Sequence, residues 1–208
     1  MSENTFDALV QEIRNCRICV DSPFKMPLAH KPRPVLSVSK SAKICICGQA
    51  PGTRVHASGK PFTDPSGVRL RSWLNLEEDV FYDVSKVAIV PMGFCFPGQD
   101  SRGSDLPPRR ECRHHWHDSL FENMSQIELI LVIGQYAMSY HLKDRMKANL
   151  TDTVGAWREY WYEGRDEWQP RVMPMPHPSW RNNSWLKKNS WFEADVLPVL
   201  RQEIARLI

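Results

Sequence analysis

The sequence contains no long hydrophobic run, and no stretch approaches the roughly 20 consecutive apolar residues that a membrane-spanning helix requires. It begins with acidic and polar residues, MSENTFDALVQEI, where a secretory signal peptide has basic residues followed by an apolar segment. These absences predict a cytoplasmic protein that has no membrane partner.

Cysteine and net charge are also scarce. Six cysteines in 208 residues are too few for a secreted domain held together by disulfides. The formal net charge of +3 permits nucleic-acid binding without requiring it. Hydrophobic residues make up 42% of the chain, which excludes wholesale disorder. We expect a monomer with one domain over residues 1–208, in which residues 1–42 form a helix and an arm packed on the core.

Four segments have the character of strands. Continuous apolar runs at residues 44–47, 87–90 and 129–133 predict strands that are buried on both faces. A weaker candidate at 171–175 contains Pro174, which cannot donate to a ladder and therefore predicts an edge strand. Helical patterns separate these runs, so the fold class is α/β with a parallel sheet.

Helix signals lie around the strands. Ser66 is the expected cap of a helix that continues to Leu74, and Pro198 predicts a kink or a helix start near Leu197. Three histidines, His114, His115 and His117, do not share one helix face well and predict a solvated surface. The other helices are expected at residues 6–13, 109–122, 136–147 and from 190 to the end.

Parallel sheets bind ligands beyond the carboxyl ends of their strands, so the segments that follow the strands should gather at one edge. These segments are residues 48–52, 91–98, 134–136 and 177–179. The first opens a Gly- and Pro-rich stretch, GQAPGTRVHASGKPFTDPSG, which matches neither the Walker pattern nor GxGxxG. It brings His56 and Asp64 close to Phe62. The alternative is a surface loop whose glycines only satisfy turns.

A second stretch, MPHPSWRNNSW, places His177 between two prolines that fix its backbone and aim the imidazole. Trp180, Arg181 and Asn182 follow, and an aromatic next to basic and amide side chains suits phosphate contact and insertion between bases. The alternative is a proline-bounded turn with a hydrogen-bonded histidine.

The cysteines form a third pattern. Cys16 and Cys19 are a CxxC pair, and Cys95 and Cys112 follow as single residues. In a reducing compartment such thiols suggest a metal or an iron–sulfur cluster more than disulfides. Zinc and free thiols stay open as alternatives, whereas the two cysteines within residues 44–47 have the character of small core residues.

These three patterns resemble the uracil-DNA glycosylase superfamily, most closely its bacterial family 4 type and that type's uncharacterised relatives. The family 4 motif GEAPGxxEDxxGxPF corresponds here to GQAPGTRVHASGKPF, and its late HPS motif corresponds to His177, Pro178 and Ser179. Its CxxC pair and two later cysteines match Cys16, Cys19, Cys95 and Cys112 in order. The resemblance covers most of the chain, and the three motifs together are far more specific than any one of them.

The resemblance implies a three-layer α/β/α sandwich with a four-stranded parallel sheet in the order 2-1-3-4. It implies a monofunctional DNA glycosylase that hydrolyses the N-glycosidic bond of deoxyuridine and starts base excision repair. The partner would be DNA containing uracil or another deaminated base. The four matching cysteines would hold a [4Fe–4S] cluster with a structural role.

The resemblance also implies roles for individual residues. The target base leaves the DNA helix, Phe62 stacks on it, and His177 hydrogen-bonds uracil O2 as negative charge builds. Trp180 and Arg181 are candidates for the wedge that replaces the base. Residues of the turns at the strand ends would bind the base, and those after the HPS histidine would contact DNA: Gly48, Ala50, Pro51, Gly52 and Gly93, and Ser179, Trp180, Arg181 and Asn182.

The chain departs from the family pattern where water is activated. Gln49 replaces the family 4 Glu, Ala50 stands where other families have Asp, and Val55 and His56 replace an acidic pair. Gln49 is able to orient water, and His56 or Asp64 would act as a base if the loop folds inward.

The Asn that family 4 carries before its third cysteine is also absent, since the matching stretch is PMGFC. Three alternatives follow: a glycosylase for hypoxanthine or xanthine, a non-catalytic or product-retaining sensor of uracil or abasic DNA, and a small-molecule α/β enzyme.

Overall fold

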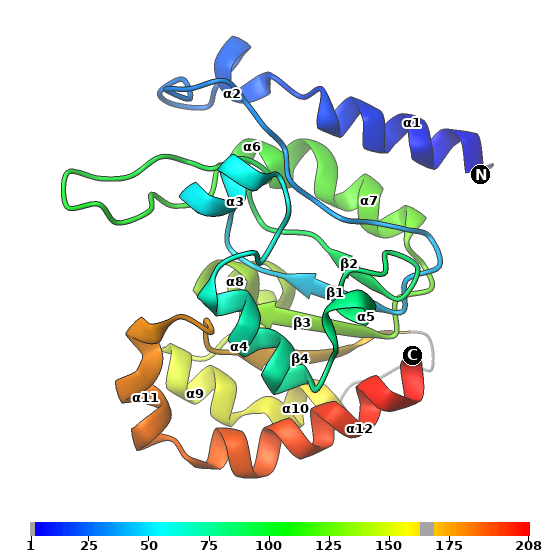
Figure 1. Ribbon diagram of the computed structural model, residues 1–208, viewed down its shortest axis with the longest axis vertical. Helices are drawn as coiled ribbons and strands as arrows, with labels where there is room; N and C mark the ends of the chain where they lie inside the picture. Colours follow the sequence, from blue (N-terminus) through cyan, green and yellow to red (C-terminus); the bar gives the residue numbers. More distant parts are fainter. Residues whose placement is uncertain (1–2, 163–168) are drawn as a thin grey trace.

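A computed structural model describes residues 3–162 and 169–208, and a four-stranded parallel sheet lies at its centre (Figure 1). The strand order is β2-β1-β3-β4, which confirms the predicted fold class and topology. The strands are β1 (Ile44–Cys47), β2 (Val87–Ile89), β3 (Leu129–Ile133) and β4 (Arg171–Met175).

Burial explains why these residues form the sheet. Every residue of β1, β2 and β3 is buried, as expected for parallel strands covered on both faces. Cys45 and Cys47 are fully buried small residues of the core, as predicted. Pro174 pairs with Val132 on β3, and within the described part of the chain β4 is the last strand of the sheet, so the proline lies on an edge strand as predicted.

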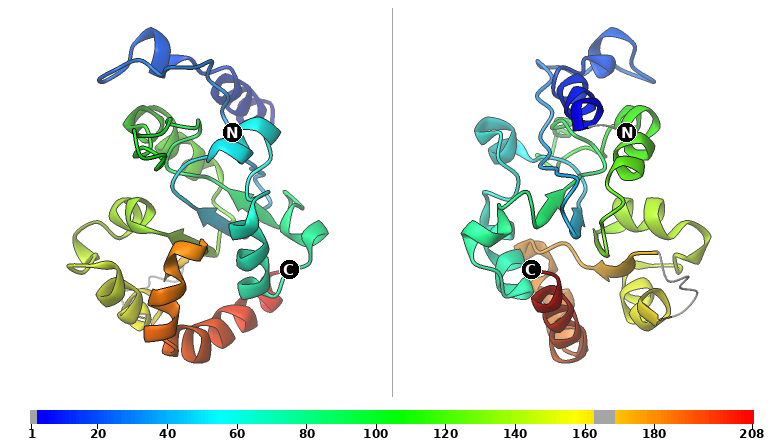
Figure 2. Two further views of the ribbon diagram at one scale, coloured as in Figure 1. Left: turned by 60° about the vertical axis from the view of Figure 1, so that its left-hand side comes forward. Right: turned by 90° about the vertical axis from the view of Figure 1, so that its right-hand side faces the viewer.

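Helices cover both faces of the sheet (Figures 1 and 2). Helices α4 (Pro65–Leu74) and α12 (Leu197–Leu207) pack together on one face, and α7 (Asp118–Asn123) and α8 (Gln135–Leu142) lie on the other. The other α-helices are α1 (Glu3–Arg14), α2 (Ile18–Asp21), α3 (Thr53–Ser58), α5 (Glu78–Phe81), α6 (Arg110–Cys112), α9 (Leu150–Gly155), α10 (Trp157–Tyr162) and α11 (Asn183–Lys188). Short 3-10 turns are η2 (Lys143–Arg145) and η3 (Trp180–Asn182).

Two π-helical turns, η1 (Arg113–His117) and η4 (Phe192–Val196), interrupt the helical layers. After η4, α12 begins at Leu197 with Pro198 in its first turn, where a missing N–H is tolerated, as predicted. The prediction of a solvated histidine surface is confirmed for His114 and His115 but wrong for His117, which η1 turns into the core.

The start of α4 differs from the prediction. Asp64, not Ser66, is the N-cap, because its carboxylate accepts a hydrogen bond from the Gly67 N–H at 3.2 Å. The Ser66 hydroxyl donates to the same carboxylate oxygen of Asp64. Asp64 is the better acceptor because it carries a full negative charge at the positive end of the helix.

The arm that follows α2 lies along the outer edge of β2. Ser37 and Ile89 exchange backbone hydrogen bonds of 3.0 and 2.6 Å, and the Val35 N–H donates to the Phe94 carbonyl at 2.7 Å. The arm therefore covers a sheet edge that would otherwise expose unpaired backbone groups. Among the described residues, no helix is long and apolar enough to cross a membrane.

The two ends of the chain lie on the right in Figure 1, whereas the β1 arrow and the long loop after β2 point to the left. In the right-hand view of Figure 2, which faces that right-hand side, both ends come toward the viewer.

Candidate active site at the carboxyl edge of the sheet

A cavity of about 110 Å³ lies at the carboxyl ends of the strands. It adjoins a wider hollow of about 590 Å³, and residues from distant parts of the sequence line both. The shared lining residues include Gln49 and Ala50 after β1, Asp105 from the loop after β2, and His177 after β4.

Pro91 lines the cavity and Pro97 the hollow, so the predicted segments after these three strands gather at one edge. The segment predicted after β3 does not reach either space, because Gln135 and Tyr136 line a separate pocket beside Met92.

The turn after β1 is held by backbone hydrogen bonds. The N–H groups of Met92 and Gly93 donate to the carbonyls of Gly48 and Gln49, each at 2.9 Å. The turn is thus fixed to the segment after β2, and Gly48, Gln49, Ala50, Pro51 and Gly52 face the cavity. Gly93 supports the turn from behind and does not line the cavity.

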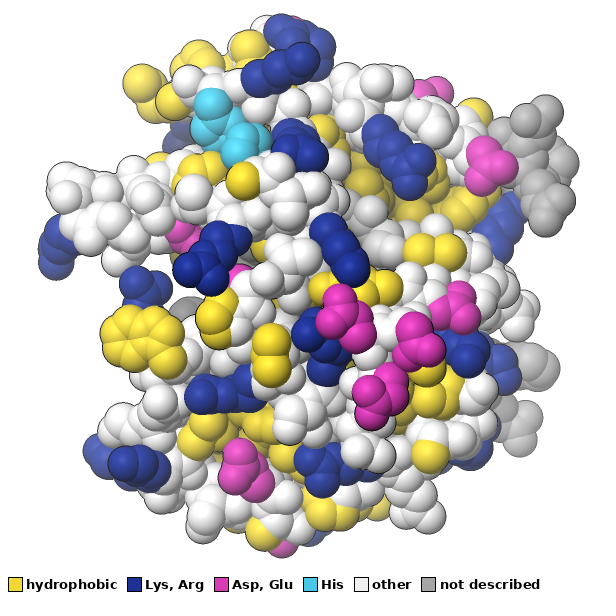
Figure 3. Space-filling view, in the orientation of Figure 1, with side chains coloured by type: hydrophobic (Ala, Val, Ile, Leu, Met, Phe, Trp, Pro, Cys, Tyr) yellow, Lys and Arg dark blue, Asp and Glu magenta, His cyan; other side chains and the backbone are white. Residues whose placement is uncertain are grey.

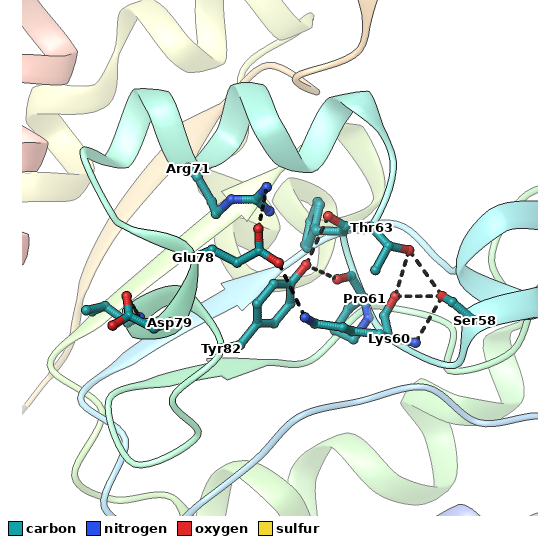
Figure 4. A network of polar contacts seen from close by, with 10 residues as sticks. Ser58, Lys60, Pro61, Thr63, Arg71, Glu78, Asp79 and Tyr82 are labelled. Atoms are coloured by element: carbon teal, nitrogen blue, oxygen red, sulfur yellow. Dashed lines mark hydrogen bonds and ion pairs between the residues drawn. The ribbon is translucent and has the colours of Figure 1, made fainter.

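Phe62 lines the cavity in an unusual backbone conformation. Its φ is 54°, in the left-handed region that residues other than glycine rarely adopt. The hydroxyl of Tyr82 contacts the carbonyl oxygens of Pro61 and Phe62 at 2.9 and 3.1 Å (Figure 4). A side chain at Gly67 would collide with the Phe62 carbonyl, because an added Cβ would lie 1.8 Å from its oxygen. Tyr82 and Gly67 therefore fix the backbone that carries the ring.

Charged residues hold Tyr82 in place (Figure 4). The Lys60 ammonium lies 3.6 Å from the centroid of the Tyr82 ring, and Glu78 pairs with Lys60 and Arg71, each at 3.5 Å. Burial raises the pKa of Tyr82, with Arg71 opposing it, so the hydroxyl stays a donor at neutral pH.

His177 lines both the cavity and the hollow. The Asn182 amide donates to the His177 carbonyl at 2.7 Å, and the Arg69 guanidinium donates to the Ser179 carbonyl at 3.1 Å. Burial lowers the pKa of His177, while the charges of Asp64 and Asp105 oppose that shift. The imidazole is therefore neutral at pH 7, with one ring nitrogen able to donate and the other able to accept a hydrogen bond.

The rim of the hollow is basic and carries one large exposed aromatic residue. Trp180 is 72% exposed, which is unusual for a tryptophan, and the Arg181 guanidinium lies 5.7 Å from its ring centroid. Arg54 and Arg69 line the same hollow. Figure 3 shows Lys and Arg side chains gathered around the left side of this face, with a group of Asp and Glu side chains away from it on the right.

Comparison with known families agrees with this geometry. Residues 37–201 match the family model described as the uracil DNA glycosylase superfamily. The chain belongs to the uracil DNA glycosylase superfamily. Its function is accordingly of the DNA glycosylase type, and its partner is DNA.

The structure does not bring every predicted site residue of this superfamily member to the cavity. His56 packs instead against His30 and Phe96, with ring centroids 4.7 and 5.8 Å away. Burial lowers the pKa of His56, and neither the cavity nor the hollow includes it. Asn182 is a support for the His177 turn, as its hydrogen bond shows.

Asp105 and Tyr82 are the residues that sequence reasoning missed. The segment expected at the sheet edge after the second strand ended at Gly98. The chain turns back beyond that point, because Gln99 and Asp105 form an antiparallel bridge. An available signal was the glycine pair, Gly98 and Gly103, since both adopt positive φ and permit the loop to reverse.

The four cysteines of the predicted metal site come from three segments, because Cys16 and Cys19 lie together near the N-terminus. All are free thiols; Cys19, Cys95 and Cys112 are buried and Cys16 is partly exposed. The Phe94 N–H donates to the Cys112 sulfur at 3.3 Å, and the Trp116 indole donates to the Cys16 sulfur at 3.4 Å.

The thiols of Cys19 and Cys112 are hydrogen-bonded, which lowers the pKa of Cys19 to about 7. Burial raises the pKa of Cys95 to about 12. In residues 3–162 and 169–208, no group of three or more His, Cys, Asp or Glu is arranged to hold a single metal ion. The donor set of four thiols with N–H groups aimed at sulfur fits an iron–sulfur cluster, whose ligands surround several irons.

Proposed function

We propose that this protein hydrolyses the N-glycosidic bond of a flipped-out deoxyuridine in DNA and so initiates base excision repair. The observation that carries the proposal is the position of Phe62 and His177, which lie far apart in sequence and line one cavity at the sheet edge. A flat aromatic face beside a neutral N–H donor suits a flat base with a carbonyl that gains negative charge.

Extrusion of the base costs a few kcal/mol of stacking and pairing, and contacts with the remaining DNA must offset that cost. Trp180 is exposed at the rim and is the candidate wedge that enters the stack. Arg54, Arg69 and Arg181 line the hollow and supply positive charge for the phosphates on either side of the extruded base.

Inside the cavity, Phe62 stacks on the base and His177 donates to O2. As the C1′–N1 bond breaks, its electron pair moves onto the base, and the His177 N–H stabilises the resulting anion. Backbone groups of Gln49 and Ala50 bind the base or orient water. Gln49, which is able to orient water, and Asp64, which is a candidate base, both line the cavity.

We also propose that Cys16, Cys19, Cys95 and Cys112 hold a [4Fe–4S] cluster. Such a cluster would cross-link the N-terminal segment to the core, and its role here is structural. The two N–H donors aimed at Cys16 and Cys112 support this assignment, because hydrogen bonds to ligand sulfurs are a feature of such sites.

Single-turnover base release from oligonucleotides with one uracil, hypoxanthine or xanthine tests the glycosylase proposal. We expect uracil release that falls about 100-fold or more in His177→Ala, since it removes a donor to the developing anion. Phe62→Ala should lose about 10- to 100-fold through weaker stacking. His115→Ala, a change at an exposed histidine, is the matched control.

Other outcomes separate the alternatives. Wild-type activity in both variants would contradict the assigned site. Release of hypoxanthine or xanthine but not uracil would show that the protein is a glycosylase for another deaminated base. Tight binding to abasic DNA without release of any base would favour a sensor, a role motivated by the acidic residue missing from the first motif.

A further inference from the structure

The loop after β2 is an ordered hairpin. Gln99 and Asp105 pair across it, and the Leu106 N–H donates to the Gly98 carbonyl at 2.9 Å. Asp100 closes the turn, because its Oδ1 accepts from the N–H groups of Arg102 and Ser104, each at 2.9 Å. These bonds give the side chain of Asp105 a defined position.

That position is the mouth of the candidate active site. Asp105 lines both the cavity and the hollow, together with His177. Its Oδ1 accepts a hydrogen bond from the Gln99 amide at 3.1 Å. Its Oδ2 lies against the turn after β1, since a Cβ added at Gly52 would be 3.3 Å from it. One carboxylate oxygen is thus anchored and the other is directed toward the turn that carries Gln49.

The other groups at the cavity are weaker candidates for taking a proton. Gln49 is an amide and has no basic site. Asp64 uses Oδ1 to accept from both the Gly67 N–H and the Ser66 hydroxyl, so this oxygen is occupied in capping α4. Among the described residues, Asp105 accepts a side-chain hydrogen bond from the Gln99 amide alone, and only on Oδ1.

We propose that Asp105 is the general base that activates the attacking water. This inference rests on the proposed glycosylase function. The water oxygen forms a bond to C1′ as the C1′–N1 bond breaks and its electron pair leaves with the base. The water gives one proton to the Asp105 carboxylate, which returns it to the departing base directly or through solvent. One water is consumed, and a free base and an abasic sugar are formed.

The surrounding charges fit this role. The groups that face the hollow beside Asp105 are His177, Asp64, Arg54, Arg69 and Arg181. The three arginines place positive charge beside the Asp105 carboxylate, where DNA phosphates would approach. The N–H of His177 is assigned to the base carbonyl, which leaves the carboxylate as the group proposed to take the water proton. The hairpin therefore supplies the acidic function that the first sequence motif lacks.

The test compares Asp105→Asn with the wild type in single-turnover uracil release. Asn keeps the oxygen that accepts from Gln99 but is no longer a base, so we expect the chemical rate to fall about 100-fold or more. The dissociation constant for DNA with an uncleavable 2′-fluoro deoxyuridine should change by no more than about threefold, because the loss belongs to the transition state.

Asp100→Asn is the matched control, because it removes a charge from the same hairpin and keeps the oxygen that closes the turn. It should release uracil at the wild-type rate.

Normal release by Asp105→Asn, or a loss confined to Asp64→Asn, would overturn the inference and leave the proposed function standing. If Asp105→Asn and Asp100→Asn both lost release rate and DNA affinity to the same extent, the hairpin would have only a structural role and the inference would be wrong. If the wild type releases no base, both the proposed function and the inference fail.

Discussion

At the scale of single residues, Phe62 is the most constrained part of the candidate site. A left-handed backbone costs about 1–2 kcal/mol for a residue with a side chain, and surrounding contacts must hold it there. Tyr82 supplies a hydroxyl and Gly67 leaves room for the carbonyl. Strain of this kind is common at ligand sites, which fits a ring held ready for a base.

We expect Tyr82→Phe to weaken binding of uracil DNA about fivefold or more and to lower the free energy of unfolding by about 1 kcal/mol, because the carbonyls of Pro61 and Phe62 lose the one hydroxyl donor that they share. Fluorescence binding to 2′-fluoro deoxyuridine DNA and urea unfolding measure the two effects. Tyr162→Phe, at an exposed tyrosine, is the control. Unchanged DNA binding by Tyr82→Phe would show that the hydroxyl does not position Phe62.

The sequence was a good guide to some residues and a poor guide to others. Phe62 and His177 each stand in a short motif at a strand end, so their meeting was predictable. His56 lies in the same motif as Phe62. Val55 is the buried residue of α3, so the next residue, His56, faces the arm and packs against His30. Asp105 and Tyr82 belong to no motif, and only the folded chain brings them to the site.

At the scale of elements, the π-helical turn η1 changes which residues the helix buries. A π turn inserts an extra residue, so side chains beyond it shift to another face. His117 consequently enters the core, where its ring stacks on Phe94 with centroids 5.2 Å apart. Periodicity of 3.6 residues does not anticipate such a shift, which is why the predicted histidine surface was wrong at this one position.

Burial lowers the pKa of His117 to about 4, with the Pro91 carbonyl and Asp118 opposing the shift. The unfolded chain binds a proton near pH 6.5 and the folded chain does not, so stability is full above that pH and falls as pH drops toward 4. We expect a loss of about 2 kcal/mol at pH 5 relative to pH 8 from this residue.

Urea unfolding at pH 8 and pH 5 measures that loss. His117→Phe retains a flat ring among Phe94, Phe121 and Tyr140 and should lose less stability on acidification than the wild type. His115→Ala, at an exposed position, should lose as much as the wild type. An equal loss in His117→Phe and wild type would assign the acid sensitivity to other groups.

At the scale of the whole molecule, the proposed cluster would add a covalent cross-link between the N-terminal segment and a core into which Phe6, Val10 and Ile13 already pack. Cys16 and Cys19 belong to the N-terminal segment, whereas Cys95 and Cys112 belong to the core side. Glu111 adds a second link, because its carboxylate accepts from the Phe24 N–H at 3.0 Å and from Arg109 at 2.6 Å.

We expect anaerobically purified protein to contain iron and to show a visible absorption band. Cys19→Ser should lose both the band and the iron, because a cluster needs all its thiolate ligands. Cys45→Ala, which changes a cysteine of the core, should keep them. Colourless protein without iron, and with four reactive thiols, would contradict the proposal.

The overall topology was predictable for a physical reason. Three apolar runs can only be buried on both faces, and Pro174 restricts the fourth strand to an edge. The confirmed order β2-β1-β3-β4 came from family resemblance, since strand order depends on contacts between distant segments. The course of the arm along β2 and the hairpin that presents Asp105 have no periodic signature, and the sequence alone did not predict them.

The position of the chain ends has a practical consequence. Both ends of the described chain lie on the side opposite the loops at the carboxyl edge (Figures 1 and 2). A dye, an affinity handle or a glass surface attached through Ile208 would leave the mouth of the cavity facing the bulk solution. Molecules immobilised in this way should therefore bind long duplex DNA with the same dissociation constant as molecules free in solution.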